Sequence, residues 1–114
     1  MNLLEVMDRI KAAVDSDPVL QAAIGTRVVY GIPTAHPSIY ADGFFATNDK
    51  QNSYAFNVNL TYARGDINDA ATFYDLTERL KVALTASPSI VGGSWLDRSE
   101  ETVHRALFDC RTWL

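Results

Sequence analysis

The sequence has little of the chemistry on which most enzymes and metalloproteins depend. It holds one cysteine and two histidines among 114 residues. A lone cysteine cannot form a disulfide within the chain, so Cys110 is expected to be a buried structural residue. His36 and His104 are far apart in the chain, and neither has a neighbour at the spacing of zinc ligands. We therefore predict no metal site, no cofactor and no catalytic residue.

The chain also lacks a cluster of positive charge. Its ten Lys and Arg residues are scattered, and the formal net charge is -4. Proteins that bind nucleic acids usually present a concentrated basic face to the phosphate backbone. We expect no specific binding of DNA or RNA.

Long apolar runs are missing as well. No stretch approaches the roughly 20 residues that a membrane-spanning helix needs, so we expect no membrane partner. The start of the chain has neither the basic residues nor the apolar stretch of a signal peptide, which predicts synthesis in the cytosol. Asp97, Glu100 and Glu101 could form an acid–base pair, but a solvated turn between strands explains such a cluster more simply.

Three segments have the pattern of helices. From Leu3 to about Ala13 the apolar residues recur every three or four positions, which predicts an amphipathic helix. A second, short helix is expected from Pro18 to Ile24, because good capping residues precede the proline. Asp66 can cap a third helix, which is expected to stop at Ser87.

Strands are expected in the remaining segments. The segment Tyr54–Tyr62 alternates aromatic or aliphatic residues with Asn, Thr and Ala at a period of two. This pattern predicts a half-buried strand with one face on the helices and an Asn and Thr face toward water, a lumen or another subunit. Further strands are expected at Arg27–Tyr30 and Thr102–Trp113, and Gly92-Gly93 is expected to form a turn between two short apolar runs.

The segment between Pro33 and Asn52 is expected to hold one strand flanked by a long, mobile loop. Together the segments predict an α+β fold, with an antiparallel sheet of about four to five strands and two main helices packed on one face. All 114 residues are expected to form one domain.

The order of these elements resembles the small tail-terminator and tail-completion (neck) proteins of tailed phages and prophages. The resemblance spans nearly the whole chain, as a helix, a strand, a strand with a long loop, a long amphipathic strand, a helix and a final hairpin. The local features that carry it are the helix end at Val19-Leu20-Gln21, the strand and proline turn Arg27–Pro33, the strand Tyr54–Tyr62 and the closing strand Arg105–Asp109.

The resemblance implies a structural virion protein without enzymatic activity. In such a role about six subunits form a ring that caps the tail tube, stops its polymerisation and joins the tail to the head. The implied partners are the tail tube protein and the head-completion or connector proteins, and DNA passes through the lumen without specific binding. The implied location is the neck of the virion, infectious or phage-derived, after assembly in the cytoplasm of a bacterial host.

A closed ring uses head-to-tail interfaces, so each subunit needs two different complementary surfaces. An exposed sheet edge and a mobile loop are suitable for this purpose. We expect these surfaces in the loop Asp42–Asn52 and in the final strand. The candidate interface residues are Asp42, Phe44, Phe45, Asn48, Asp49, Lys50, Arg105, Asp109 and Arg111.

Two other interpretations fit the same pattern. One is a different head–tail connector or neck protein of similar size. The other is a small dimeric α+β ligand-binding domain, in which the sheet carries helices on one face and dimerises through the other. Such a domain needs an apolar pocket with a few polar groups, and the candidate lining residues are Tyr40, Phe44, Trp95 and His104.

Overall fold

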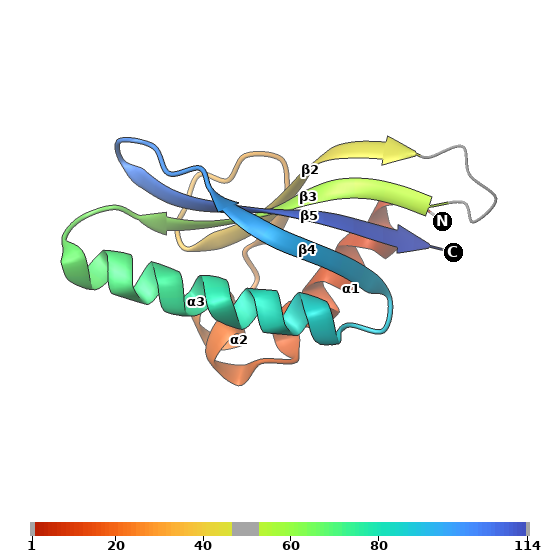
Figure 1. Cartoon of the computed structure of the whole chain (residues 1–114), viewed down its shortest axis with the longest axis horizontal. Helices are drawn as coiled ribbons and strands as arrows, with labels where there is room; N and C mark the ends of the chain where they lie inside the picture. The colour runs from red at the N-terminus through yellow and green to blue at the C-terminus, as the bar shows by residue number, and fades with distance from the viewer. Residues whose placement is uncertain (1, 47–52, 114) are drawn as a thin grey trace.

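The protein is built from one sheet with three helices on one side of it (Figure 1). This arrangement comes from a computed structural model, which describes residues 2–46 and 53–113. It confirms the predicted α+β class. The helices are α1 (Leu3–Asp15), α2 (Pro18–Ile24) and α3 (Ile67–Ala86), and the strands are β1 (Val28–Tyr30), β2 (Ser38–Ala46), β3 (Ser53–Ala63), β4 (Ile90–Asp97) and β5 (Val103–Trp113).

The sheet has five strands in the order β1-β2-β3-β5-β4. The pairs β2–β3, β3–β5 and β4–β5 are antiparallel, whereas β1 pairs parallel to β2. The sheet is therefore mixed, where a purely antiparallel one was expected. A parallel pair requires the chain to return to the level at which β1 starts before β2 begins. Because β1 has only three residues, the connection formed by residues 31–37 is long enough for this return.

The helices begin where the sequence places capping residues. Asp17 accepts hydrogen bonds from the backbone of Val19 and Leu20, with a proline at the first position of α2. Asp66 and Asp69 form a capping box at the start of α3. These bonds satisfy N–H groups that the first turn of a helix leaves without partners.

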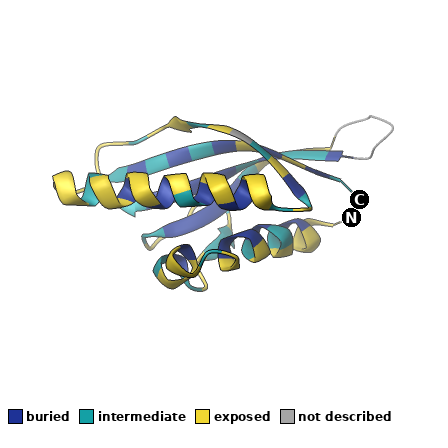
Figure 2. Ribbon diagram, turned by 60° about the horizontal axis from the view of Figure 1, so that its bottom comes forward, coloured by how far each residue is buried: buried dark blue, intermediate teal, exposed yellow. Residues whose placement is uncertain are grey.

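The hydrophobic core lies between the helices and one face of the sheet (Figure 2). The expected alternation in β3 holds on this side, because Phe56, Val58 and Leu60 are all buried. The largest fully buried side chains are Phe73 of α3 and Phe108 of β5. At roughly 25 cal/mol per Å² of apolar surface, such burial is the main favourable contribution to folding.

Two loop predictions are wrong. Gly92 and Gly93 do not form a turn but lie inside β4, whose register against β5 shifts between Gly92 and Trp95. The first half of the predicted loop Asp42–Asn52 is the end of β2, with a similar shift between Asp42 and Phe45. A β-bulge inserts an extra residue into a strand without ending the strand, so a glycine in the sequence does not always mark a turn. Residues 47–52, which include the candidates Asn48, Asp49 and Lys50, lie outside the described residues.

Candidate subunit interface

The face of the sheet that points away from the helices is covered by none of the described helices (Figure 1). We call it the open face. The register places a row of side chains across it from β2 to β4, in the order Phe45, Ala55, Arg111 and Val91. A second row ends with Leu107 of β5 and Leu96 of β4, and further side chains on this face are Asp42, Asn57, Asn59, Thr61, Arg105 and Asp109.

Five of the nine predicted interface residues lie on the open face. They come from two strands that are separated by β3, and the fold brings them together on one surface: Asp42, Phe45, Arg105, Asp109 and Arg111. Phe44 lies on the opposite side, with its ring stacked on Phe56 at a centroid distance of 5.5 Å. The bulge between Asp42 and Phe45 breaks the alternation of β2, which no period-two pattern would have shown.

A polar cluster lies in the middle of the open face. Arg105 donates hydrogen bonds to the Tyr40 hydroxyl at 3.2 Å and to the Asn59 side-chain oxygen at 3.3 Å. The Asn59 amide in turn donates to Asp42 at 3.0 Å. This face of β3 was expected to meet water, a lumen or another subunit, but Asn59 is fully buried and Thr61 nearly so within the chain itself. These polar groups are buried because neighbouring side chains cover them and satisfy their hydrogen bonds.

The segment formed by residues 31–37 is hydrogen-bonded to one end of this cluster through His36. His36 Nδ1 lies 2.7 Å from the Thr61 hydroxyl, which lies 2.7 Å from the Ser38 hydroxyl. A histidine held in this way acts as a structural residue. Within residues 2–46 and 53–113, no three His, Cys, Asp or Glu side chains gather as metal ligands would.

The predicted ligand pocket is not formed by the residues proposed for it. Tyr40 lies on the open face, whereas His104 stacks on Phe73 on the side of the helices, at a centroid distance of 4.9 Å. Trp95 donates instead to Glu78 of α3. A cavity of about 260 Å³ does lie beside Tyr40, and its walls also include Ile32, Pro33, His36, Asp42, Thr61, Glu100, Val103 and Arg105.

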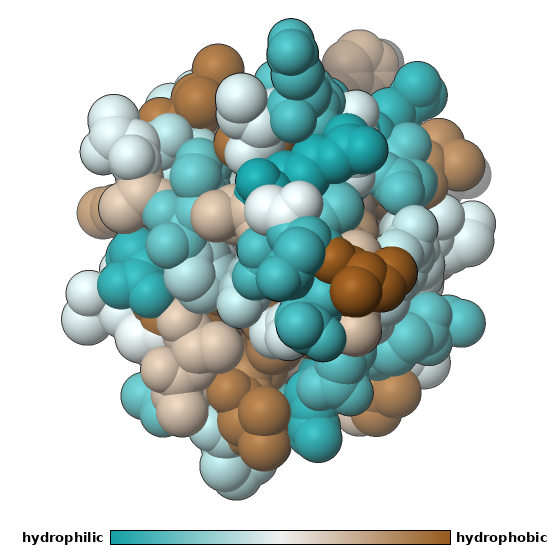
Figure 3. Space-filling view, turned by 90° about the vertical axis from the view of Figure 1, so that its left-hand side faces the viewer, coloured by the Kyte–Doolittle hydropathy of each residue, from teal (hydrophilic) through white to brown (hydrophobic). Residues whose placement is uncertain are grey.

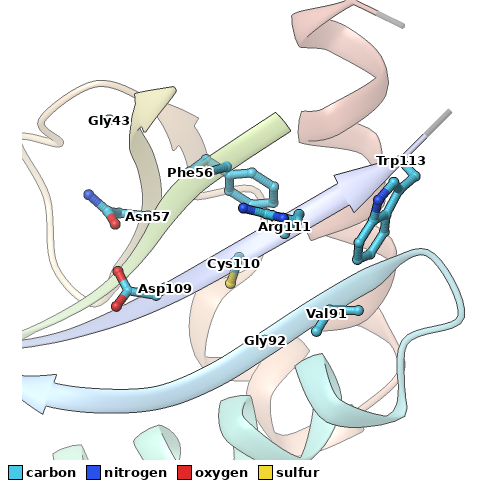
Figure 4. A pocket seen from close by; sticks show the side chains of 10 residues that line it. Gly43, Phe56, Asn57, Val91, Gly92, Asp109, Cys110, Arg111 and Trp113 are labelled. Carbon is cyan, nitrogen blue, oxygen red and sulfur yellow. The ribbon is translucent and has the colours of Figure 1, made fainter. Parts of the chain in front are cut away.

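A wider groove of about 560 Å³ runs along the open face near the end of β5 (Figure 4). Arg111 and Trp113 of β5 and Val91 of β4 stand around it, with Asp109 at its other end. The surface is hollow there because the lining includes Ala55, which has only a methyl side chain. This groove could not be predicted from the sequence, because it depends on the register of β3, β4 and β5.

Gly43 borders the same groove at a position with no room for a side chain. Its φ angle is +63°, and a Cβ atom at this position would lie 2.6 Å from the side-chain nitrogen of Asn57. A side chain would therefore be strained in its backbone and would displace Asn57. The glycine allows β2 to bend past β3 at the bulge.

Cys110 faces the helices and is 5% exposed. Burial raises the pKa of its thiol to about 12, and the charge of Asp109 adds to this shift. The thiol is therefore protonated at neutral pH and is a poor nucleophile. This agrees with the structural role predicted for it.

The three clustered carboxylates lie at the β4–β5 turn. Hydrogen bonds from Ser99 lower the pKa of Asp97, against an opposing effect of burial, and the Tyr74 hydroxyl donates to the same carboxylate at 3.0 Å. Asp97 therefore stabilises the turn through Ser99 and links β4 to α3 through Tyr74. Figure 3 shows this end of the molecule, where hydrophilic side chains predominate and apolar ones are scattered.

No family model matches the sequence, and a search of curated proteins found no similar one. None of the described helices is long and apolar enough to cross a membrane.

Proposed function

We propose that the protein is a structural virion protein, a phage tail terminator that forms a ring on the end of the tail tube and joins the tail to the head. The observation that carries the proposal is the open face, which none of the described helices covers and which carries exposed apolar and charged side chains around its buried polar cluster. Phe45, Val91 and Leu96 on this face are 65%, 57% and 51% exposed. An uncovered face of this kind in a small protein indicates a contact with another chain.

The sheet edges are less suited to a contact than the open face. The edge strand β1 has three residues, and the other edge strand, β4, is interrupted by a bulge between Gly92 and Trp95. Short or bulged edge strands resist pairing with a further strand. The expected contact through a sheet edge is therefore replaced in our proposal by a contact through the open face.

The charge of the chain is consistent with this role. A net charge of -4 disfavours binding to the DNA backbone, so that a duplex in the lumen of the ring would slide without sticking. The proposed partners are the tail tube protein and the head-completion or connector proteins. The proposed location is the neck of the virion, after assembly in the bacterial cytoplasm.

The direct test uses tail tubes assembled from the tube protein of the same phage. The purified protein is added during tube growth, and the tubes are imaged by negative-stain electron microscopy. We expect a ring at one end of each tube and a halt in lengthening at the time of addition. Tubes that keep growing and carry bare ends would refute the proposal.

Two other candidate functions have different readouts in related assays. A different neck or connector protein would bind the head connector and leave tube ends bare. A dimeric ligand-binding domain is favoured by one observation, the cavity of about 260 Å³ beside Tyr40 and Arg105. It would be a tight dimer whose melting temperature rises with a small molecule, and the Arg105→Ala variant would lose that rise.

A further inference from the structure

The cavity beside Tyr40 is bordered by parts of the chain that lie far apart in the sequence. Its walls come from the β1–β2 connection, from β2, β3 and β5, and from Glu100 in the β4–β5 turn. Its volume of about 260 Å³ is smaller than the roughly 300–1,000 Å³ of pockets that hold drug-sized ligands. The cavity therefore suits a ligand smaller than these.

Arg105 and Tyr40 bring unused hydrogen-bond donors to this cavity. The guanidinium group of Arg105 donates from Nη1 to Tyr40 and Asn59, and from Nε to the Arg98 carbonyl. Its Nη2 lies 4.0 Å from the Glu100 carboxylate, which is longer than a hydrogen bond, and has no other partner among the described residues. The Tyr40 hydroxyl accepts from Arg105, and no described side chain or carbonyl accepts its own proton. The two donors can both serve one carboxylate.

Asp42 brings an unused acceptor to the same cavity. Its Oδ1 accepts a hydrogen bond from Asn59 at 3.0 Å. Within the part of the chain that the structure describes, Oδ2 has no hydrogen bond and Asp42 forms no ion pair. The residue is partly buried, and a charge that is partly removed from water is costly unless it is paired. A cationic group of a ligand would supply the missing partner.

The rest of the wall is partly apolar, through Ile32, Pro33 and Val103. A simple anion would use the donors of Arg105 and leave Asp42 unpaired, whereas a simple cation would do the reverse. A ligand that carries a carboxylate, an ammonium group and a small apolar side chain uses all three kinds of wall.

We propose that this cavity binds a small free amino acid as its zwitterion. The α-carboxylate accepts hydrogen bonds from Arg105 Nη2 and the Tyr40 hydroxyl, the α-ammonium group donates to Asp42 Oδ2, and the side chain packs on Ile32 and Val103. The inference does not rest on the proposed tail function, because the cavity lies within one chain.

Glu100 competes with such a ligand. Its carboxylate is near Arg105 Nη2, at 4.0 Å, where the carboxylate of the amino acid has to bind. The Glu100 side chain is 70% exposed, so it can move into water at little cost when the ligand enters. Removing its charge should therefore strengthen the binding of an amino acid, whereas it would weaken the binding of a simple cation.

Isothermal titration calorimetry with four probes tests the site on the wild-type chain. The probes are glycine, L-alanine, L-valine and L-leucine, and the one that binds best is compared with two analogues of the same side chain. For L-valine these are 3-methylbutanoate, which lacks the ammonium group, and 2-methylpropylamine, which lacks the carboxylate. The amino acid should bind ~10-fold or more tightly than either analogue, because each analogue loses a hydrogen bond between charged groups.

Two variants and a matched control locate the binding. Asp42→Asn keeps an acceptor for Asn59 and removes the charge, so it should weaken the amino acid ~10-fold and leave the carboxylate analogue unaffected. Glu100→Gln should strengthen the amino acid. Glu101→Gln removes the same charge from an exposed neighbour that does not line the cavity, and should change nothing. Circular dichroism checks that the variants are folded.

Three outcomes overturn the inference. They are a wild-type chain that binds none of the four probes, an analogue that binds as tightly as the amino acid, and a Glu100→Gln variant that binds the amino acid more weakly. The first two need no variant, so the test holds even if a variant does not fold. Tube capping by a chain that binds no amino acid refutes this inference alone, whereas amino acid binding by a chain that never caps tubes refutes the proposed function alone.

Discussion

Asn59 holds together the polar cluster on the open face, and the Asn59→Ala substitution tests that role. The side chain is fully buried and makes two hydrogen bonds, one from Arg105 and one to Asp42. Alanine removes both bonds and leaves two charged groups without that partner. The other partners of Arg105, including the Tyr40 hydroxyl, remain.

The magnitude follows from these two bonds. A hydrogen bond to a charged group contributes roughly 1.5–3 kcal/mol to stability, so two such bonds set an upper limit of about 3–6 kcal/mol. Asp42 and Arg105 are each only partly buried and can regain hydration from water. We therefore expect the free energy of unfolding to fall by about 2 kcal/mol. At about 2.1 cal/mol/K per residue over the 114 residues, this lowers the melting temperature by about 8 °C.

Asn57→Ala is the matched control, because Asn57 lies on the same face of β3, is less buried and forms no hydrogen bond with these groups. It should change the free energy of unfolding by less than about 0.5 kcal/mol. Urea unfolding followed by circular dichroism measures both variants at pH 7. Equal losses for Asn57→Ala and Asn59→Ala would refute the view that the cluster, and not the strand position, carries this stability.

Three further predictions concern other parts of the molecule. Hydrogen bonds from the α2 backbone and Arg79 lower the pKa of Asp17 below 3.8, so its charge stabilises the fold above that pH and the contribution is lost as pH falls through the lowered pKa. Asp17→Asn should therefore be less stable than the wild type at pH 7 and equal to it in strong acid; a gap that persists in acid contradicts this. Gly43→Ala should cost about 1–3 kcal/mol in urea unfolding, because the backbone is left-handed and the new Cβ would contact Asn57, and a neutral result would show that β2 relaxes there. Cys110 should react with a thiol reagent at pH 8 only when the chain unfolds, and rapid labelling of the folded protein would contradict its burial.

Local patterns were enough to predict most of the elements. The 3.6-residue period fixed α1 and α3, and the caps at Asp17 and Asp66 fixed where α2 and α3 begin, because each depends on residues near each other in the chain. The period-two pattern of Tyr54–Tyr62 likewise predicted β3 and its core-facing side. Glycines were less informative, because Gly43 and Gly92 lie at bulges and not at turns.

The candidate interface was predicted only in part. Arg105, Asp109 and Arg111 were predicted because they lie in the final strand, and the structure places all three on one face of it. It could not show that Val91 and Trp113 border the same groove, or that Asn59 is buried. Both depend on which strands pair and in what register, and long-range pairing leaves no local trace in the sequence.

The sequence by itself determined the α+β class, the helices with their caps and the core-facing side of β3, because these depend on hydrophobic period and on contacts within a few residues. Only the tertiary structure decided the parallel β1–β2 pair, the two bulges and the single open face on which Asp42, Phe45 and Arg111 meet. Those features arise from the pairing of distant strands and from the packing of the three described helices on one side of the sheet, which leaves its other face without a helix among the described residues.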